Sequence, residues 1–273
     1  MYKLIVSDLD ETLLNNSHEI CDKNIEMINL ASKMGIKFIP ATGRGFGEIS
    51  NILKTLDLYD KENEYVISYN GCALTENKSS RIMSFDGLPF DKANELYKFG
   101  ITKDVCIHVY TKEMRYVYNL NDWEKQRFIN QGTPYQEINE QSLEFLRDTE
   151  IAKVIYQNLD VPYLKKLSEE MTEMTDNAVS VSFSSNCYME LNKIGVNKGD
   201  AVLNLAKLLE VNPQEVIVVG DNYNDVSMLK IAGLSVAAGN AVQDVKDMCH
   251  YVCKNDNNDG VLAEVIEKFI LKK

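Results

Sequence analysis

Two aspartates two positions apart, Asp8 and Asp10, follow a short apolar run near the start of the chain. Residues 4–6, Leu-Ile-Val, have the apolar, partly β-branched character of a buried strand. Residues two apart on an extended backbone point to the same side, so both carboxylates would meet at the strand's carboxyl end. Such a pair needs a shared proton or a cation, and an all-oxygen site suits Mg²⁺. Taken alone, a solvated turn after an ordinary strand explains these residues equally well.

Three later stretches also place polar residues directly after expected strands. They are residues 41–44 (Ala-Thr-Gly-Arg), 197–199 (Asn-Lys-Gly) and 220–225 (Gly-Asp-Asn-Tyr-Asn-Asp). The first opens a segment expected to be helical, where a hydroxyl, a glycine and a helix N-terminus would suit an anion. The last collects acidic and amide groups that suit a hard cation. The ordinary alternatives are helix capping and a solvated surface lysine.

Residues 8–14 (Asp-Leu-Asp-Glu-Thr-Leu-Leu) and these three stretches, in this order, resemble the motifs of the haloacid dehalogenase-like hydrolase superfamily. The closest resemblance is to its Cof-type sugar-phosphatase branch. Each motif is short, but the four are jointly specific and the resemblance covers nearly the whole chain. Many members of the superfamily have glycine where this chain has Glu11. We expect Glu11 to alter the turn or the edge of the cleft without abolishing the chemistry.

The resemblance implies a Mg²⁺-dependent phosphatase that hydrolyses small phosphomonoesters, such as sugar phosphates, through an aspartyl-phosphate intermediate. Asp8 would be the nucleophile, and Asp10 the general acid and base. Mg²⁺ would be held by the Asp8 carboxylate, the Asp10 backbone carbonyl and Asp221. The residues expected to hold the transferring phosphoryl group are Leu9, Thr42, Gly43, Lys198 and Asn224. The residues expected to support the site or line its lip are Arg44, Asn70, Gly71 and Asp225.

Two other functions remain open at this point. A phosphomutase or phosphotransferase on the same core would pass the phosphoryl group to an alcohol instead of water. A non-catalytic ligand-binding or regulatory protein could use the same fold. The intact pair of aspartates, together with Lys198 and Asp221, argues against the second alternative.

The elements that must position these residues alternate between strand and helix at both ends of the chain. Strands are expected at residues 4–6, 37–40, 65–69 and 215–220, and a small hairpin at residues 72–74 and 82–85. Helices are expected at residues 22–34, 41–56, 198–209, 225–232 and 261–270. Strand–helix–strand units favour parallel pairing. We therefore predict an α/β fold with a Rossmann-like, mostly parallel sheet core formed by residues 1–85 and 193–273.

The pattern changes in the middle of the chain, after Gly87 and Pro89. Alternating apolar residues favour antiparallel strands at residues 105–110, 114–118, 151–156, 179–183 and 188–191. Helices are expected at residues 92–99 and 162–174. Residues 86–192 are therefore predicted to form an inserted α+β cap domain. The resemblance implies that this cap is a lid that sets substrate specificity.

Composition narrows the classes of partner. The chain has 273 residues, 45% of them hydrophobic, and a net charge of −12, which argues against nonspecific binding of nucleic acid or anionic membranes. No apolar run approaches the length of a membrane span, and no secretory signal is visible. Six scattered cysteines fit a reducing cytoplasm better than a disulfide framework. We expect a cytoplasmic monomer or small homo-oligomer whose partner is a small phosphorylated metabolite.

Shorter motifs are expected to be structural. The stretch from Cys249 to Cys253 is interpreted as a strand, because no second Cys/His pair nearby would complete four zinc ligands. Residues 255–260, Asn-Asp-Asn-Asn-Asp-Gly, resemble the start of a calcium loop, but its twelfth position is Ile266 where a glutamate is needed. A surface loop is expected there. His18 and His108 are likewise expected to be structural rather than catalytic.

Overall fold

The computed structural model describes residues 1–132 and 134–272. The chain folds into two compact units. The first comprises Met1–Ser84 and Asn197–Lys273, and the second, Phe85–Val196, is inserted between those two segments. That the second unit serves as a cap stays a prediction.

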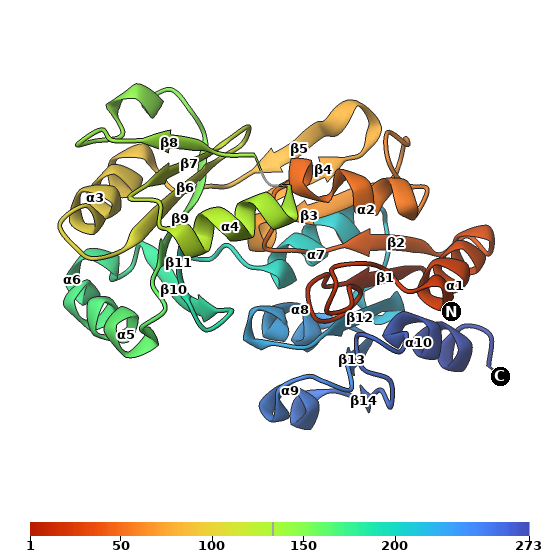
Figure 1. The fold of residues 1–273 in the computed structure, drawn as a ribbon. Coiled ribbons are helices and arrows are strands. Elements are labelled where there is room, and N and C mark those ends of the chain that lie inside the picture. Colours follow the sequence, from red (N-terminus) through yellow and green to blue (C-terminus); the bar gives the residue numbers. More distant parts are fainter. Residues whose placement is uncertain (133, 273) are drawn as a thin grey trace. The chain divides into compact units, whose positions relative to one another are not determined.

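The sheet of the first unit is parallel and has the strand order β14-β13-β12-β1-β2. Its strands are β1 (Leu4–Ser7), β2 (Lys37–Pro40), β12 (Val216–Gly220), β13 (Leu234–Ala237) and β14 (Tyr251–Val252). β1 lies between β2 and β12 and pairs with β12 through Ser7 and Val219 (Figure 1). The residues that follow these two strands therefore leave the sheet side by side, at its carboxyl edge. The predicted parallel α/β fold is confirmed.

Helices cover both faces of this sheet. α1 (Asp22–Lys33) and α10 (Val261–Phe269) pack on the face that contains Ile5, while α7 (Lys198–Leu208) and α8 (Val226–Ile231) pack on the face that contains Val6 (Figure 1). Neighbouring residues of β1 thus point to opposite apolar cores, as expected for a parallel strand buried on both sides.

A three-stranded sheet with the order β3-β4-β5 completes the first unit. It consists of β3 (Tyr65–Ser68), β4 (Ala73–Glu76) and β5 (Arg81–Phe85). A parallel bridge between Ala41 and Ile67 ties the segment after β2 to β3. This bridge places the residues after β2 next to those after β3.

The second unit contains a six-stranded sheet with the order β10-β11-β9-β6-β7-β8. The strands are β6 (Cys106–Thr111), β7 (Arg115–Tyr118), β8 (Gln136–Ile138), β9 (Ile151–Gln157), β10 (Val179–Ser184) and β11 (Tyr188–Lys193). All pairs are antiparallel except β7 with β8. One face forms an apolar core that contains Val109 and Tyr156 and residues of α3 (Phe90–Gly100) and α5 (Val161–Glu170).

Several elements differ from the predictions. The helix predicted for residues 41–56 starts only with a 3₁₀ turn at Phe46–Ile49, followed by α2 (Ser50–Thr55). Residues 41–45 are not helical because the Thr42 amide bonds to the Ile67 carbonyl at 2.9 Å and the Arg44 carbonyl accepts from Tyr69 at 3.0 Å. The prediction that a helix N-terminus lies beside Thr42 is therefore wrong.

Other differences concern helix breaks and elements that were not expected. The helix predicted for residues 162–174 breaks at Met171 into α5 and α6 (Thr172–Thr175). The unexpected elements are α4 (Asp122–Gln131), α9 (Gln243–Met248), β8 and β13. In the part of the chain that the structure describes, no helix has both the length and the apolar character needed to cross a membrane. The six cysteines are free thiols.

Candidate active site

The centre of the site is a buried lysine between two aspartates. Asp8 follows β1 directly, and its amide bonds to the Val219 carbonyl of β12 at 3.0 Å. Lys198 is the first residue of α7 and has no exposed surface. Its Nζ donates to Asp8 Oδ1 at 2.5 Å and to Asp225 Oδ1 at 2.7 Å. The parallel sheet thus brings together residues from both segments of the first unit.

Asp225 connects this lysine to the backbone after β12. Its Oδ2 accepts from the amides of Asp221 at 3.0 Å and Asn222 at 3.3 Å. A side chain at Gly220 would meet the Asp225 carboxylate at 2.6 Å, so glycine is needed for this tight turn. Asp225 therefore holds both Lys198 and the turn that presents Asp221.

Asp221 is fixed by a residue that sequence reasoning missed. The hydroxyl of Thr12 donates to Asp221 Oδ1 at 2.9 Å, and both residues are buried. The available signal was a threonine in the first motif, two residues after Asp10 and directly before two leucines. A hydroxyl at such a position needs a partner, since burying it unpaired costs free energy.

The charges of this cluster are not balanced. Burial raises the pKa of Asp8 well above its ordinary value. The positive charge of Lys198 lowers this pKa, but the negative charges of neighbouring carboxylates raise it again. Burial, followed by the charge of Asp225, raises the pKa of Asp221 to about 7. Burial opposes the charge on Lys198, but Asp225 and Asp8 raise its pKa above the ordinary value. Three carboxyl groups share one ammonium group there, so a further cation would favour the ionised forms of Asp8 and Asp221.

This donor set fits Mg²⁺. One carboxylate oxygen each from Asp8, Asp221 and Asp225 lies within 4.8 Å of the others. Hard oxygen ligands and excess negative charge are what Mg²⁺ requires. Asp225 already bonds to Lys198 and to backbone amides, so Asp8 and Asp221 are the side chains best suited to face a cation.

Asp10 has different surroundings from Asp8. Arg44 forms a bidentate hydrogen bond with the carboxylate of Asp10: Nε donates to Oδ2 at 2.9 Å, and Nη2 donates to Oδ1. His18 Nδ1 lies 3.7 Å from the same Oδ1, within ion-pair distance. Burial opposes the charge on Asp10, but His18 and Arg44 hold its pKa well below the ordinary value. Asp10 is thus a carboxylate in this structure, with 45% of its side chain exposed.

The second predicted motif forms a compact turn beside β3. The Thr42 hydroxyl accepts from the Arg44 amide at 3.0 Å, and the Thr42 carbonyl accepts from the Asn70 amide at 2.9 Å. A side chain at Gly43 would meet Asn70 Oδ1 at 3.3 Å. The structure therefore brings Thr42, Gly43, Arg44 and Asn70 together, with Arg44 linking this turn to Asp10.

The other predicted site residues have less direct placements. Gly71 has φ +104°, and a side chain there would meet the carbonyl oxygen of Asn197 at 2.2 Å. This packing against the residue before Lys198 explains the glycine without a substrate contact. Leu9 is buried in the apolar core, so only its backbone could serve a phosphate. Asn224 is exposed in the turn before α8, and its role in phosphate binding stays a prediction.

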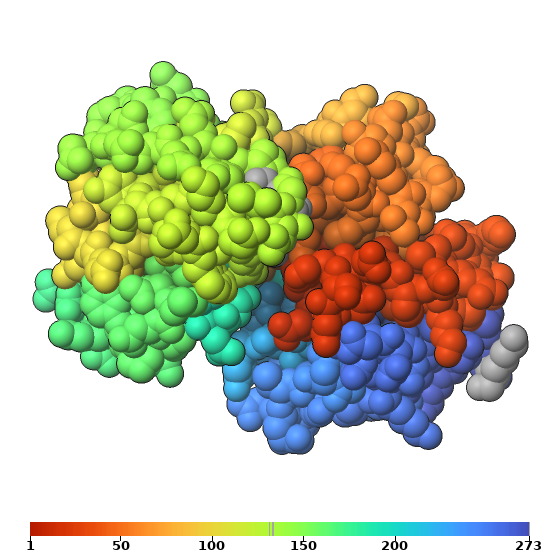
Figure 2. Space-filling view, in the orientation of Figure 1, coloured from red at the N-terminus to blue at the C-terminus, as the bar shows by residue number. Residues whose placement is uncertain are grey.

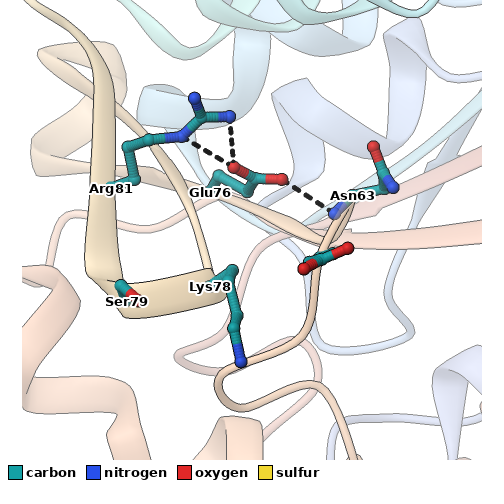
Figure 3. A pocket seen from close by; sticks show the side chains of 6 residues that line it. Asn63, Glu76, Lys78, Ser79 and Arg81 are labelled. Atoms are coloured by element: carbon teal, nitrogen blue, oxygen red, sulfur yellow. Dashed lines mark hydrogen bonds and ion pairs between the residues drawn. The ribbon is translucent and has the colours of Figure 1, made fainter.

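A separate surface hollow of about 520 Å³ lies beside β4 and β5 (Figure 3). There Arg81 Nε and Nη2 donate to Glu76 Oε2 at 2.8 Å and 2.5 Å, and Glu76 Oε1 accepts from the Asn63 amide at 2.9 Å. Because its arginine and its buried carboxylate bond to each other, this hollow offers no set of groups comparable to the cluster around Lys198.

Comparisons with known proteins agree with this arrangement. A family model described as haloacid dehalogenase-like hydrolase matches residues 5–265. The protein YxeH of Bacillus subtilis (strain 168) is 29% identical over 279 residues, which cover 100% of this chain and 100% of YxeH. The 5-amino-6-(5-phospho-D-ribitylamino)uracil phosphatase YcsE of the same organism is 26% identical over 269 residues, which cover 98% of this chain and 96% of YcsE.

A solved structure has the same fold. The crystal structure of a haloacid dehalogenase-like hydrolase from Bacteroides thetaiotaomicron superimposes with a TM-score of 0.88 at 29% sequence identity. The superposition covers 99% of this chain and 100% of the other.

Proposed function

The chain belongs to the haloacid dehalogenase-like hydrolase family, and we propose that it is a Mg²⁺-dependent phosphatase of small phosphomonoesters. Sugar phosphates and similar phosphorylated metabolites are the proposed substrates. The relative YcsE is named as a phosphatase of one such metabolite. The second unit is proposed to be the cap that selects among substrates.

One observation carries this proposal. The fully buried Lys198 bonds to Asp8, which is one of three clustered carboxyl groups together with Asp221 and Asp225. A buried lysine holds one Asp8 oxygen in place and carries positive charge that would face an incoming phosphate. Burying such a group is costly unless its charge is used or compensated. Strongly perturbed ionisable groups in one cluster are characteristic of catalytic sites.

In the first step, an Asp8 carboxylate oxygen attacks phosphorus while the bond from phosphorus to the ester oxygen breaks. The products are an aspartyl-phosphate on Asp8 and the alcohol, whose oxygen must gain a proton. Lys198 stabilises negative charge on the transferring phosphoryl group, and the amide of Leu9 and the Thr42 turn are proposed to hold its oxygens. When bound by Asp8, the Asp10 carbonyl and Asp221, Mg²⁺ would supply positive charge that lets phosphate approach the carboxylates.

In the second step, water attacks the phosphorus of the aspartyl-phosphate and regenerates Asp8. Asp10 is proposed to take the proton from this water. The carboxylate form of Asp10 can accept a proton, but its hydrogen bonds to Arg44 weaken it as a base, so they must loosen during this step. Before Asp10 can protonate the alcohol in the first step, its carboxylate must separate from Arg44 and take up a proton.

A panel of phosphomonoesters tests this proposal. Hexose phosphates, pyridoxal phosphate, nucleotides and an aryl phosphate are incubated with metal-stripped protein, with and without Mg²⁺, and released phosphate is measured. We expect turnover only with Mg²⁺. Full activity after metal removal, or no activity on any ester, would contradict the proposal. Transfer of phosphate to an added alcohol instead of water would identify a phosphotransferase.

A further inference from the structure

The first motif ends in a single turn in which three backbone amides bond to one carbonyl oxygen. The amides of Thr12, Leu13 and Leu14 all donate to the Leu9 carbonyl, at 3.3, 3.0 and 2.8 Å. Glu11 has φ +58° within this turn, a left-handed conformation that costs a non-glycine residue free energy. The turn therefore needs outside contacts to keep its shape.

Those contacts come from two loops near the C-terminus. Asn240 Nδ2 donates to the Glu11 carbonyl at 2.7 Å, which is the carbonyl of the peptide that precedes Thr12. Asn240 Oδ1 accepts from the amide of Asn257 at 3.1 Å. One asparagine therefore connects the Glu11–Thr12 peptide to the loop of residues 255–260.

Asn257 provides the second contact and is buried although its neighbours Asn258 and Asp259 are exposed, with 4% of its own surface accessible. Its Nδ2 donates to the Leu14 carbonyl at 3.1 Å and to Asn16 Oδ1 at 3.0 Å. Asn258 Oδ1 accepts from the Asn16 amide at 3.1 Å. Figure 2 shows the N-terminal and C-terminal segments adjoining at the surface of the first unit.

We infer that Asn240, Asn257 and Asn258 form an asparagine clasp whose role is to position Thr12 against Asp221. The clasp holds the turn at the peptide before Thr12 and at its far end, Leu14 and Asn16. The Thr12 hydroxyl then meets Asp221 Oδ1 at 2.9 Å. The inference rests on the proposed function, in which Asp221 is a ligand of Mg²⁺.

The chemistry of the clasp requires amides. Asn240 uses its amide as donor and acceptor at once, and Asn257 uses its Nδ2 for two acceptors. An aspartate has nearly the same shape but no donor, and it would repel the carbonyl oxygens of Glu11 or Leu14. Asparagine-to-aspartate changes therefore remove the clasp with little change in volume.

The test compares three variants that each add one negative charge. Asn240→Asp removes the donor to the Glu11 carbonyl, and Asn257→Asp removes the donor to the Leu14 carbonyl and Asn16 Oδ1. Asn255→Asp is the matched control, because among the described residues the Nδ2 of Asn255 bonds within its own loop, to the carbonyls of Asp259 at 3.3 Å and Gly260 at 3.2 Å. Thermal unfolding checks that each variant is folded. If Asn257→Asp does not fold, the test relies on Asn240→Asp alone, because Asn240 is exposed and its replacement should be tolerated.

Two measurements are made on each folded variant: kcat and KM on an aryl phosphate with Mg²⁺, and the dissociation constant of Mg²⁺ by calorimetry. Loss of a group that orients a metal ligand typically costs about 10- to 100-fold. We expect such a loss in kcat and Mg²⁺ affinity for the two clasp variants, and a change within about 2-fold for Asn255→Asp. Equal effects in all three variants would overturn the inference.

A double-mutant cycle separates positioning from general destabilisation. Once Thr12→Val has removed the hydroxyl, Asn240→Asp should lower Mg²⁺ affinity little further. A full and additive loss would overturn the inference. If the parent hydrolyses no phosphomonoester but the clasp variants still bind Mg²⁺ more weakly, the proposed function fails and the clasp stands. A parent that neither hydrolyses esters nor binds Mg²⁺ would overturn both.

Discussion

At the residue scale, the two aspartates of the first motif are separated by their surroundings. Asp8 is buried beside Lys198, whereas Asp10 is half-exposed and gripped by Arg44. Their pKa values move in opposite directions, up for Asp8 and down for Asp10. Opposite environments for two neighbouring carboxyl groups allow different roles for them.

Lys198→Met tests the buried cluster. The change leaves Asp8 and Asp225 buried without their shared cation, so we expect a loss of about 3 kcal/mol in the free energy of unfolding and no measurable turnover. Lys207→Met is the matched control, because Lys207 lies exposed on the same helix. It should change stability by less than about 0.5 kcal/mol. Urea unfolding measures both, and equal stability of the two variants would contradict the account.

Glu11→Gly tests the strained turn. Glycine accepts a positive φ without penalty, so we expect stability to rise by up to about 1 kcal/mol. The control is Glu210→Gly, because Glu210 has a similar φ of +54° at the end of α7. Both variants should be stabilised in urea unfolding, whereas only Glu11→Gly should alter kinetics, since only Glu11 adjoins the site. A loss of stability in Glu11→Gly would show that its side chain stabilises the turn.

At the element scale, strongly apolar strands and periodic helices were predictable from the sequence. Residues 215–220 predicted β12 because they contain four apolar β-branched residues in a row, and β12 (Val216–Gly220) is buried along its whole length. β13 was missed because Leu-Ser-Val-Ala is short and carries a polar serine, and its pairing with β12 and β14 comes from the fold. α4 was missed because it has few apolar residues and depends on its Asn121 cap and its Gly132 end.

The site was predictable only where a motif carried it. The sequence indicated Asp8, Lys198, Asp221 and Asp225, and the structure brings them together. The buried position of Asn257 could not be predicted, because its sequence neighbours are the same polar residue types and some of them are exposed. Its burial arises from contacts with Leu14 and Asn16, more than two hundred positions away in sequence.

The buried His108 of β6 makes the second unit sensitive to acid. Burial, reinforced by Arg115, Arg127 and Lys153, holds the pKa of His108 well below 6.5. The folded state therefore keeps His108 neutral while the unfolded chain takes up a proton below pH 6.5. Stability is fully present above that pH and falls as pH decreases towards the folded pKa, by up to about 1.4 kcal/mol per unit.

His108→Phe isolates this contribution. The ring of His108 lies 5.3 Å from Phe128 and 5.9 Å from Tyr188, so an aromatic replacement suits the site. Its neighbour Glu124, whose pKa is raised by burial, acts in the opposite direction and is present in both proteins. Urea unfolding between pH 5 and 7.5 should show a steeper loss for the parent. Parallel curves would mean that His108 is protonated in the fold.

At the scale of the whole molecule, all four clustered residues, Asp8, Lys198, Asp221 and Asp225, belong to the first unit, which has its own apolar cores. Replacing residues 85–196 by a short glycine–serine linker should therefore leave a folded protein that hydrolyses a small aryl phosphate weakly. It should no longer discriminate among metabolites, because the proposed selecting unit is gone. Unchanged ranking of the phosphomonoester panel would show that specificity lies in the first unit.

The most direct test of the central claim is to locate the phosphoryl group during turnover. The parent, Asp8→Asn and Asp10→Asn are mixed with an activated aryl phosphate and Mg²⁺, quenched in acid and analysed by peptide mass spectrometry. An aryl leaving group needs little protonation, so Asp10→Asn should still become phosphorylated on Asp8. In this variant the aspartyl-phosphate lacks a base to activate water, so its hydrolysis should slow by about 10²- to 10⁴-fold and the adduct should accumulate. Asp8→Asn should carry no adduct. An adduct in Asp8→Asn, or one on Asp10 in the parent, would contradict the account.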